Sequence, residues 1–165
     1  MRSIREQLSD EVATGLQAHG WTPERGVSSE SARQALASDG VLLHSVAAQV
    51  LESLGGLTLR SGSERWARHL RFDAAEACQW IAEEDWPFIR ALFSPSACPV
   101  ASGESTLYFV SAEGRWMALH DGWTVCYFLP DLDSVLRFAV LFGKVGAFQG
   151  RRIERHEIPP GYWDL

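Results

Sequence analysis

Apolar residues recur at helical spacing through the first third of the chain. Ile4, Leu8, Val12 and Leu16 form one stripe, which predicts a helix that ends at Gly20. A glycine there can adopt the left-handed conformation in which many helices end. Two further segments share the helical period and are predicted to be helices: 28–38, with Ser28 or Ser29 as its cap, and 43–54, which Gly55-Gly56 ends.

After residue 56 the apolar period changes from helical to alternating, which is typical of strands. Five segments are predicted to be strands: 57–60, 69–72, 106–111, 115–120 and 123–128. The last three are joined by short turns, and the Asp121-Gly122 dipeptide is a hairpin signal. Connections this short allow only antiparallel neighbours. Further helices are predicted at three places: 74–81 with Asp73 as its cap, 86–93, and the segment from Asp131 to Gly143.

This order of elements predicts an α+β fold. The sheet is expected to be mostly antiparallel, with about five to six strands and with helices packed on one face. The length of 165 residues suits a single domain covering residues 1–165, in which 144–165 form an irregular C-terminal extension.

The composition is that of an ordinary globular protein, with 46% hydrophobic and 22% charged residues. No apolar run is long enough to span a membrane, and the first residues lack a hydrophobic signal core. The cysteines are odd in number and widely spaced, which indicates reduced thiols and predicts a soluble protein of the cytoplasm. A net charge of −6 argues against nucleic acid as the main ligand and fits a basic partner better.

Motifs for catalysis, metal binding or phosphate binding are not found in the sequence. His156-Glu157 lacks the second histidine of a zinc helix, and no phosphate-binding loop or hydrolase elbow occurs. We therefore predict no catalytic residue, no metal and no cofactor. Cys126 and His120 flank the Asp121-Gly122 turn, so a thiol-dependent enzyme or small-molecule binder remains an alternative. The simpler interpretation is that Cys126 packs as a small hydrophobic residue.

Acidic residues gather in two places beside tryptophans. Glu83, Glu84 and Asp85 precede Trp86, and adjacent carboxylates beside an aromatic ring resemble an interface anchor with a charged rim. The predicted meander adds three further candidate contact residues: Glu104, Asp121 and Trp123. Of the seven tryptophans, Trp21, Trp80 and Trp116 are expected in the core, and Trp66, Trp123 or Trp163 are expected to present a face to a partner.

Two short motifs carry a family resemblance. Gly20-Trp21-x-Pro23-x-Arg25 links the first two predicted helices, and Leu54-Gly55-Gly56-Leu57 ends the third. With the order of the later elements, they make the chain resemble the SUKH superfamily, in particular its third family of bacterial immunity proteins, from about residue 8 to residue 142. The segment after Gly143 lies outside this pattern.

The resemblance implies a non-enzymatic immunity protein of a polymorphic toxin system. Such a protein binds and neutralises a cognate toxin, often a nuclease or a deaminase, and is expected to be a monomer or a weak oligomer. The motif residues are interpreted as determinants of the fold rather than of toxin choice: Gly20, Trp21, Pro23, Arg25, Gly55 and Gly56. A regulatory adaptor that binds a host protein, with no toxin involved, is the first alternative.

Overall fold

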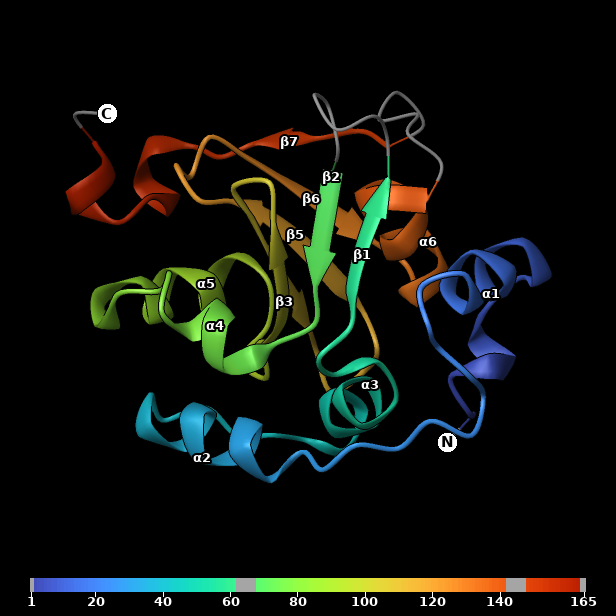
Figure 1. The fold of residues 1–165 in the computed structure, drawn as a ribbon. Helices are drawn as coiled ribbons and strands as arrows, with labels where there is room; N and C mark the ends of the chain where they lie inside the picture. Colours follow the sequence, from blue (N-terminus) through green and yellow to red (C-terminus); the bar gives the residue numbers. More distant parts are fainter. Residues whose placement is uncertain (1, 62–67, 142–147, 164–165) are drawn as a thin grey trace.

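An antiparallel sheet with the strand order β1-β2-β3-β4-β5-β6-β7 runs through the molecule (Figure 1). The structure, a computed structural model, describes residues 2–61, 68–141 and 148–163. The strands in this part of the chain are β1 (Thr58–Ser61), β2 (Arg68–Arg71), β3 (Cys98–Gly103), β4 (Thr106–Val110), β5 (Trp116–His120), β6 (Val125–Leu129) and β7 (Arg151–Arg152). The predicted α+β class with an antiparallel sheet is confirmed.

Helices surround this sheet. The α-helices are α1 (Asp10–Gln17), α2 (Glu30–Ser38), α3 (Ser45–Leu54), α4 (Ala74–Cys78), α5 (Trp86–Leu92) and α6 (Leu132–Leu136), and α6 continues into a π-helix, η3 (Arg137–Leu141). Short 3-10 turns are η1 (Arg5–Gln7), η2 (Glu83–Asp85), η5 (Arg155–Glu157) and η6 (Pro160–Tyr162). In the part of the chain that the structure describes, no helix has the length and apolarity that a membrane crossing requires.

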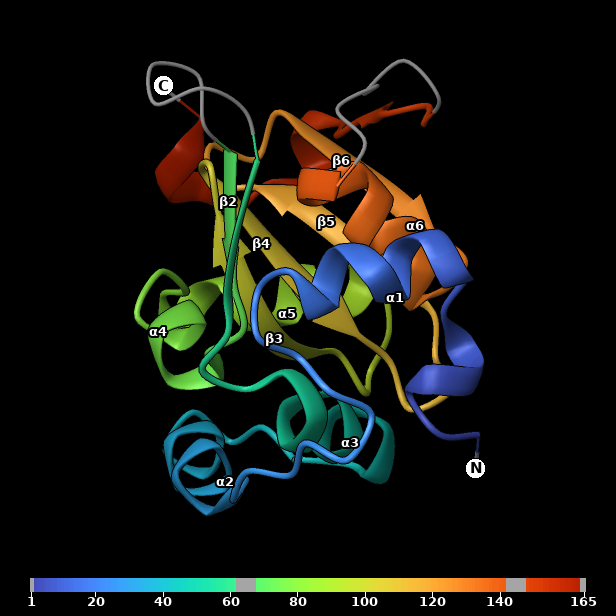
Figure 2. The ribbon, with the colours of Figure 1, turned by 45° about the vertical axis from the view of Figure 1, so that its right-hand side comes forward.

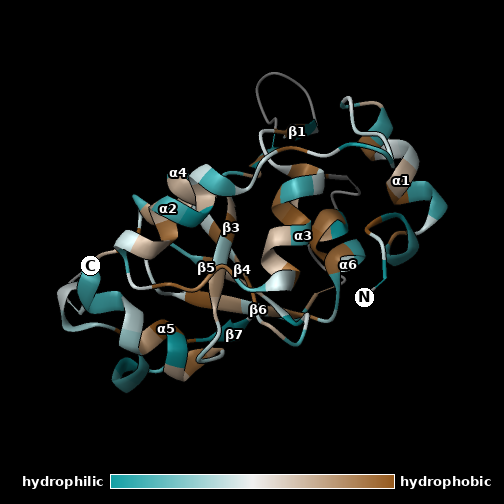
Figure 3. Cartoon of the chain, turned by 90° about the horizontal axis from the view of Figure 1, so that it is seen from below, coloured by the Kyte–Doolittle hydropathy of each residue, from teal (hydrophilic) through white to brown (hydrophobic). Residues whose placement is uncertain are grey.

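The central strands carry side chains that are buried on both faces of the sheet. Tyr108, Ala118 and Tyr127 are in register on one face, where the ring of Phe138 in η3 lies 4.6 Å from that of Tyr127. The opposite face is covered in part by α5, whose end places Phe93 in a stacked contact with Phe128. Figures 2 and 3 show α6 on one side of the strands and α5 on the other.

Capping side chains fix the starts of several helices, as the sequence predicts. Asp73 accepts a hydrogen bond from the backbone N–H of Glu76 at 3.1 Å, and Asp131 accepts one from Ser134 at 2.8 Å. The first helix differs from the expectation. Its apolar stripe is buried as predicted, but the backbone is extended at Leu8 and a new helix begins after Ser9.

The two strands that the sequence did not predict are β3 and β7. All six residues of β3 are buried, so the strand lacks the alternation of apolar and polar positions that reveals a half-buried strand. Pro99, which has no N–H to donate, lies at an irregularity in the register with β4. Strand β7 has only two residues, both arginines, and it gives the predicted irregular extension a defined attachment to β6.

A histidine covers part of the free edge of the sheet at β1. His19 follows α1, and its Nε2 lies 3.2 Å from the backbone nitrogen and 2.9 Å from the carbonyl oxygen of Arg60. The other ring nitrogen, Nδ1, lies 2.9 Å from the carbonyl oxygen of Gly15. The imidazole thus links the end of α1 to the backbone of the edge strand.

The motif residues form the junction between the helices and the sheet. Trp21 is fully buried and its indole N–H donates to the Ser53 hydroxyl at 3.1 Å. The Arg25 guanidinium donates to the carbonyl oxygen of Gly55 at 2.9 Å. Gly56 has a φ of +76°, which suits glycine, whereas Gly55 has an ordinary φ and is required by close packing instead.

Gly55→Ala is expected to destabilise the fold by about 1–3 kcal/mol, the usual cost of overpacking. A Cβ at this position would lie 2.3 Å from the carbonyl oxygen of Leu51, so the end of α3 would have to move. Gly26→Ala is the matched control, because a Cβ there meets no atom within 4 Å. Urea denaturation of the two variants measures the difference, and equal stabilities would contradict the packing argument.

Candidate functional site

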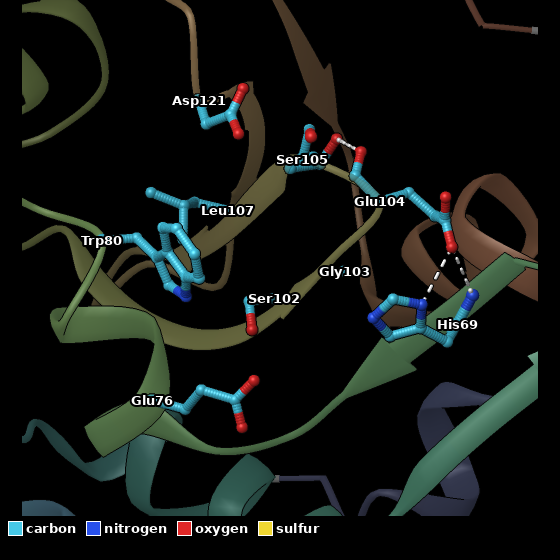
Figure 4. Close-up of a pocket in the computed structure, with 10 residues that line it drawn as sticks. His69, Glu76, Trp80, Ser102, Gly103, Glu104, Ser105, Leu107 and Asp121 are labelled. Carbon is cyan, nitrogen blue, oxygen red and sulfur yellow. Dashed lines mark hydrogen bonds and ion pairs between the residues drawn. The ribbon is translucent and has the colours of Figure 1, made fainter.

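A groove of about 350 Å³ opens where the β3–β4 turn, the β5–β6 turn and the segment after α4 meet (Figure 4). Its floor is formed by residues of β3 and β4, including Ser102 and Leu107, on the face of the sheet that α5 covers farther along. Trp80 forms one wall. The charged or titratable side chains that line the groove are His69, Glu76, Glu104 and Asp121.

The β3–β4 turn places Glu104 at the mouth of the groove. Gly103 pairs with Thr106, so Glu104 and Ser105 form a two-residue hairpin turn, with φ values of 49° and 57°. Positive φ at both central positions matches the twist of a hairpin, although such turns usually contain glycine or asparagine. The backbone N–H of Asp121 donates to the carbonyl oxygen of Ser105 at 2.8 Å, which joins this turn to the β5–β6 turn.

Two of the three groove carboxylates have a basic partner on β2. Glu104 Oε1 lies 2.8 Å from His69 Nδ1, and half of each side chain is exposed. Glu76 accepts from the Arg71 guanidinium at 2.9 Å, and the same guanidinium reaches the Asp73 carboxylate at 3.1 Å. These exposed ion pairs are worth little to stability, so the carboxylates are free to exchange partners.

Asp121 carries the third carboxylate and lies next to His120. His120 Nδ1 is 3.4 Å from the Asp121 carboxylate, but it accepts a hydrogen bond from the backbone N–H of Gly122 at 3.1 Å. A ring nitrogen that accepts a hydrogen bond has no proton to donate to the carboxylate. In this arrangement Asp121 therefore accepts no hydrogen bond from His120 Nδ1.

Trp80 is exposed, which corrects the expectation that it belongs to the core. Its exposed fraction is 64%, the highest of any tryptophan that the structure describes. Helix α4 ends at Cys78, three residues earlier than predicted, and the buried apolar position after it is Ile81. The indole is therefore turned onto the open face of β3 and β4 (Figure 4).

Three of the expected contact residues lie in the interior instead. Asp85, Trp86 and Trp123 are each at most 4% exposed. Trp123, which was also expected to present a face to a partner, packs against the rings of Phe88 and Tyr162. Each side chain contributes to packing within the chain, so we place none of the three on an exposed contact surface.

Asp85 attaches the C-terminal segment to the domain. Its Oδ2 accepts from the backbone N–H of Ala82 at 3.0 Å and from the Tyr162 hydroxyl at 3.1 Å, whereas Oδ1 is buried without a described partner. Burial raises the pKa of this carboxyl above its ordinary value of 3.8, and these two hydrogen bonds oppose the rise.

Glu83 and Glu84 are exposed, and neither forms an ion pair with a described residue. They follow the groove tryptophan by three and four residues. Of the other tryptophans, Trp21 and Trp116 are buried as expected, and Trp163 is 45% exposed with its indole N–H bonded to the carbonyl oxygen of Ile158. Trp66 lies outside the described residues.

The three cysteines are buried, which removes support from the thiol-enzyme alternative. Burial raises the pKa of Cys78 and of Cys98 to about 12, and it also raises that of Cys126 despite the nearby Arg151 guanidinium. A reactive cysteine needs the opposite shift. Within the described ranges no group of three or more histidine, cysteine or acidic residues has an arrangement that could hold a metal ion.

Sequence reasoning identified two of the groove carboxylates, Glu104 and Asp121, but missed Glu76 and the open indole of Trp80. No protein-family model, curated protein or solved structure matches the chain.

Asp85→Asn is expected to remove the part of the stability that the unchanged protein loses as the pH rises. Because the folded-state pKa of Asp85 is raised, its contribution to stability is fully present below pH 3.8 and is lost as the pH rises through the folded-state value. The free energy of unfolding of the unchanged protein, minus that of the variant, should fall as the pH rises from about 4 to about 7. Parallel pH profiles from urea denaturation would show that Asp85 does not titrate in this way.

Tyr162→Phe is expected to destabilise the protein by about 1–3 kcal/mol, because it removes one donor from a buried carboxylate. It should also make the C-terminal segment easier to cleave under limited proteolysis. Trp163→Phe changes a more exposed neighbour and serves as the control, with a smaller effect on both measurements.

Proposed function

We propose that the protein is a cytoplasmic immunity protein that binds and neutralises a basic protein toxin, a nuclease or deaminase, by covering its substrate cleft. The observation that carries this proposal is the groove, where the exposed indole of Trp80 lies among the carboxylates of Glu76, Glu104 and Asp121. An exposed aromatic ring with a charged rim is the composition of an interface anchor.

The charge of the chain supports a cationic partner. A nuclease must offer basic side chains to the phosphates of its substrate, and an acidic inhibitor is attracted to the same side chains. The net charge of −6 and the exposed carboxylates of Glu83 and Glu84 near the groove tryptophan add to this attraction. Long-range attraction raises the association rate, and steric cover of the cleft then blocks the substrate.

The motifs that resemble the SUKH superfamily support the same proposal independently of the groove. Their residues lie in the junction of helices and sheet, where Trp21, Arg25 and Gly55 make structural contacts. Residues that maintain the fold can be shared by proteins with different partners, whereas we expect the choice of partner to depend on exposed residues such as those of the groove. Neutralisation by binding needs no catalytic residue in the inhibitor.

The test is neutralisation in cells. We expect the gene to adjoin one for a secreted protein with a variable C-terminal toxin domain, and co-expression with that domain should restore growth. The double variant Trp80→Ala/Asp121→Asn should bind the toxin domain at least about tenfold more weakly, since it removes the anchor and one rim charge. Raising the salt concentration from about 0.05 M to about 0.5 M should weaken binding of the unchanged protein.

The double variant Glu11→Gln/Glu24→Gln is the control, because both carboxylates are exposed and neither lines the groove. It should retain neutralisation with a modest change in association rate. Neutralisation that survives the groove variant would move the binding site to another face. A non-toxic host protein that binds through the groove would instead support the regulatory adaptor.

A further inference from the structure

We propose that the groove binds one arginine side chain of the protein partner, with its guanidinium stacked on the indole of Trp80. This inference rests on the proposed function only in assuming a basic protein partner; it names the chemical group that the groove recognises. It commits to a single side chain because the groove, at about 350 Å³, is at the small end of the range for ligand sites.

The charges around the indole favour a cation. Figure 4 shows Trp80 with Asp121 beyond one end of the ring and Glu76 beyond the other. Glu104 lies across the groove, held by His69. The described basic groups that face these carboxylates are few, namely the Arg71 guanidinium on Glu76 and the imidazoles of His69 and His120. Of these groups only the Arg71 guanidinium is a permanent cation, so the three carboxylates outnumber the permanent positive charges by two.

The shape of the site distinguishes arginine from lysine. A guanidinium is planar and has five N–H donors in its plane, so it can lie flat on an indole while its edges donate to carboxylates at the ends of the ring. An ammonium group is a compact charge that cannot do both. The methylene groups of the same side chain would pass over Leu107, whose side chain lines the floor of the groove beside the Ser102 hydroxyl.

The groove is open because the aromatic side chains that cover this face of the sheet do not extend over the ends of β3 and β4. Farther along the same face, Phe93 and Phe128 stack, and Trp123 is enclosed by Phe88 and Tyr162. At the groove the only large ring is Trp80, and among the described residues it has no aromatic or cationic partner. By contrast, the rings of Trp86 and Trp163 already have guanidinium groups over them, at 5.7 Å and 5.2 Å.

The experiment titrates the full-length protein with three blocked tripeptides, glycine-X-glycine, where X is arginine, lysine or citrulline. Citrulline keeps the shape of arginine without its charge. The readout is the indole N–H resonance of Trp80 in a proton–nitrogen NMR spectrum, assigned through the Trp80→Phe variant. We expect the arginine peptide to shift this resonance in a saturable way, the lysine peptide to bind at least about fivefold more weakly, and the citrulline peptide to leave it unchanged.

Matched charge variants test the carboxylates. Glu76→Gln/Asp121→Asn should weaken binding of the arginine peptide at least about tenfold, whereas Glu83→Gln/Glu84→Gln, which removes the same charge outside the groove, should change it less than about twofold. Retained Trp80 and core indole resonances in both variants show that they fold. Equal responses to arginine and citrulline, equal effects of the two double variants, or no shift of Trp80 would each overturn the inference.

The inference and the proposed function fail in different ways. A toxin domain that is neutralised equally well by the Trp80→Ala variant, together with an unresponsive Trp80 resonance, rejects the arginine site and leaves the immunity function standing. Saturable arginine binding by a protein that neutralises no neighbouring toxin domain rejects the immunity function and retains the site chemistry.

Discussion

The burial of the central strands on both faces is the constraint on which the rest of the structure depends. Each residue of β3 is buried, and the strands beside it carry apolar side chains on alternate sides. A sheet of this kind needs cover on two sides. One cover is made by α6 and η3 through Phe138, and the other by α5 and the C-terminal segment through Phe93 and Tyr162. The groove lies where the second cover ends.

This arrangement also explains why two tryptophans that were predicted to be exposed are buried, and why one that was predicted to be buried is exposed. Trp86 and Trp123 follow acidic residues, which suggested an exposed anchor, but both belong to the second cover. Trp80 stands at an apolar position within the predicted helix 74–81, which suggested the core, but α4 ends before it. Local sequence describes the neighbours of a residue along the chain, and these outcomes depend on which segments meet across the sheet.

Elements with local signals were predictable from the sequence. The capping aspartates Asp73 and Asp131 and the β1–β2 pair were found because their hydrogen bonds or alternation lie within a few residues. Strand β3 was missed because complete burial erases alternation, and β7 because two arginines form no pattern. Glu104 and Asp121 were identified as acids of the meander. Their meeting with Glu76 and Trp80 depends on a turn-to-turn contact and on the place where α4 ends.

The histidine at the edge of β1 has a consequence for behaviour at high concentration. An uncovered edge strand offers its amide and carbonyl groups to a strand of another molecule, which is a route to fibrils. The His19 ring covers the N–H and the carbonyl oxygen of Arg60, and its Nε2 can hydrogen bond one of them, so a strand of another molecule is hindered from pairing at this position of β1. The opposite edge, β7, is two residues long and carries two positive charges. Among the described residues, neither edge of the sheet is a long, flat strand that is open to pairing, so these edges resist polymerisation through the backbone.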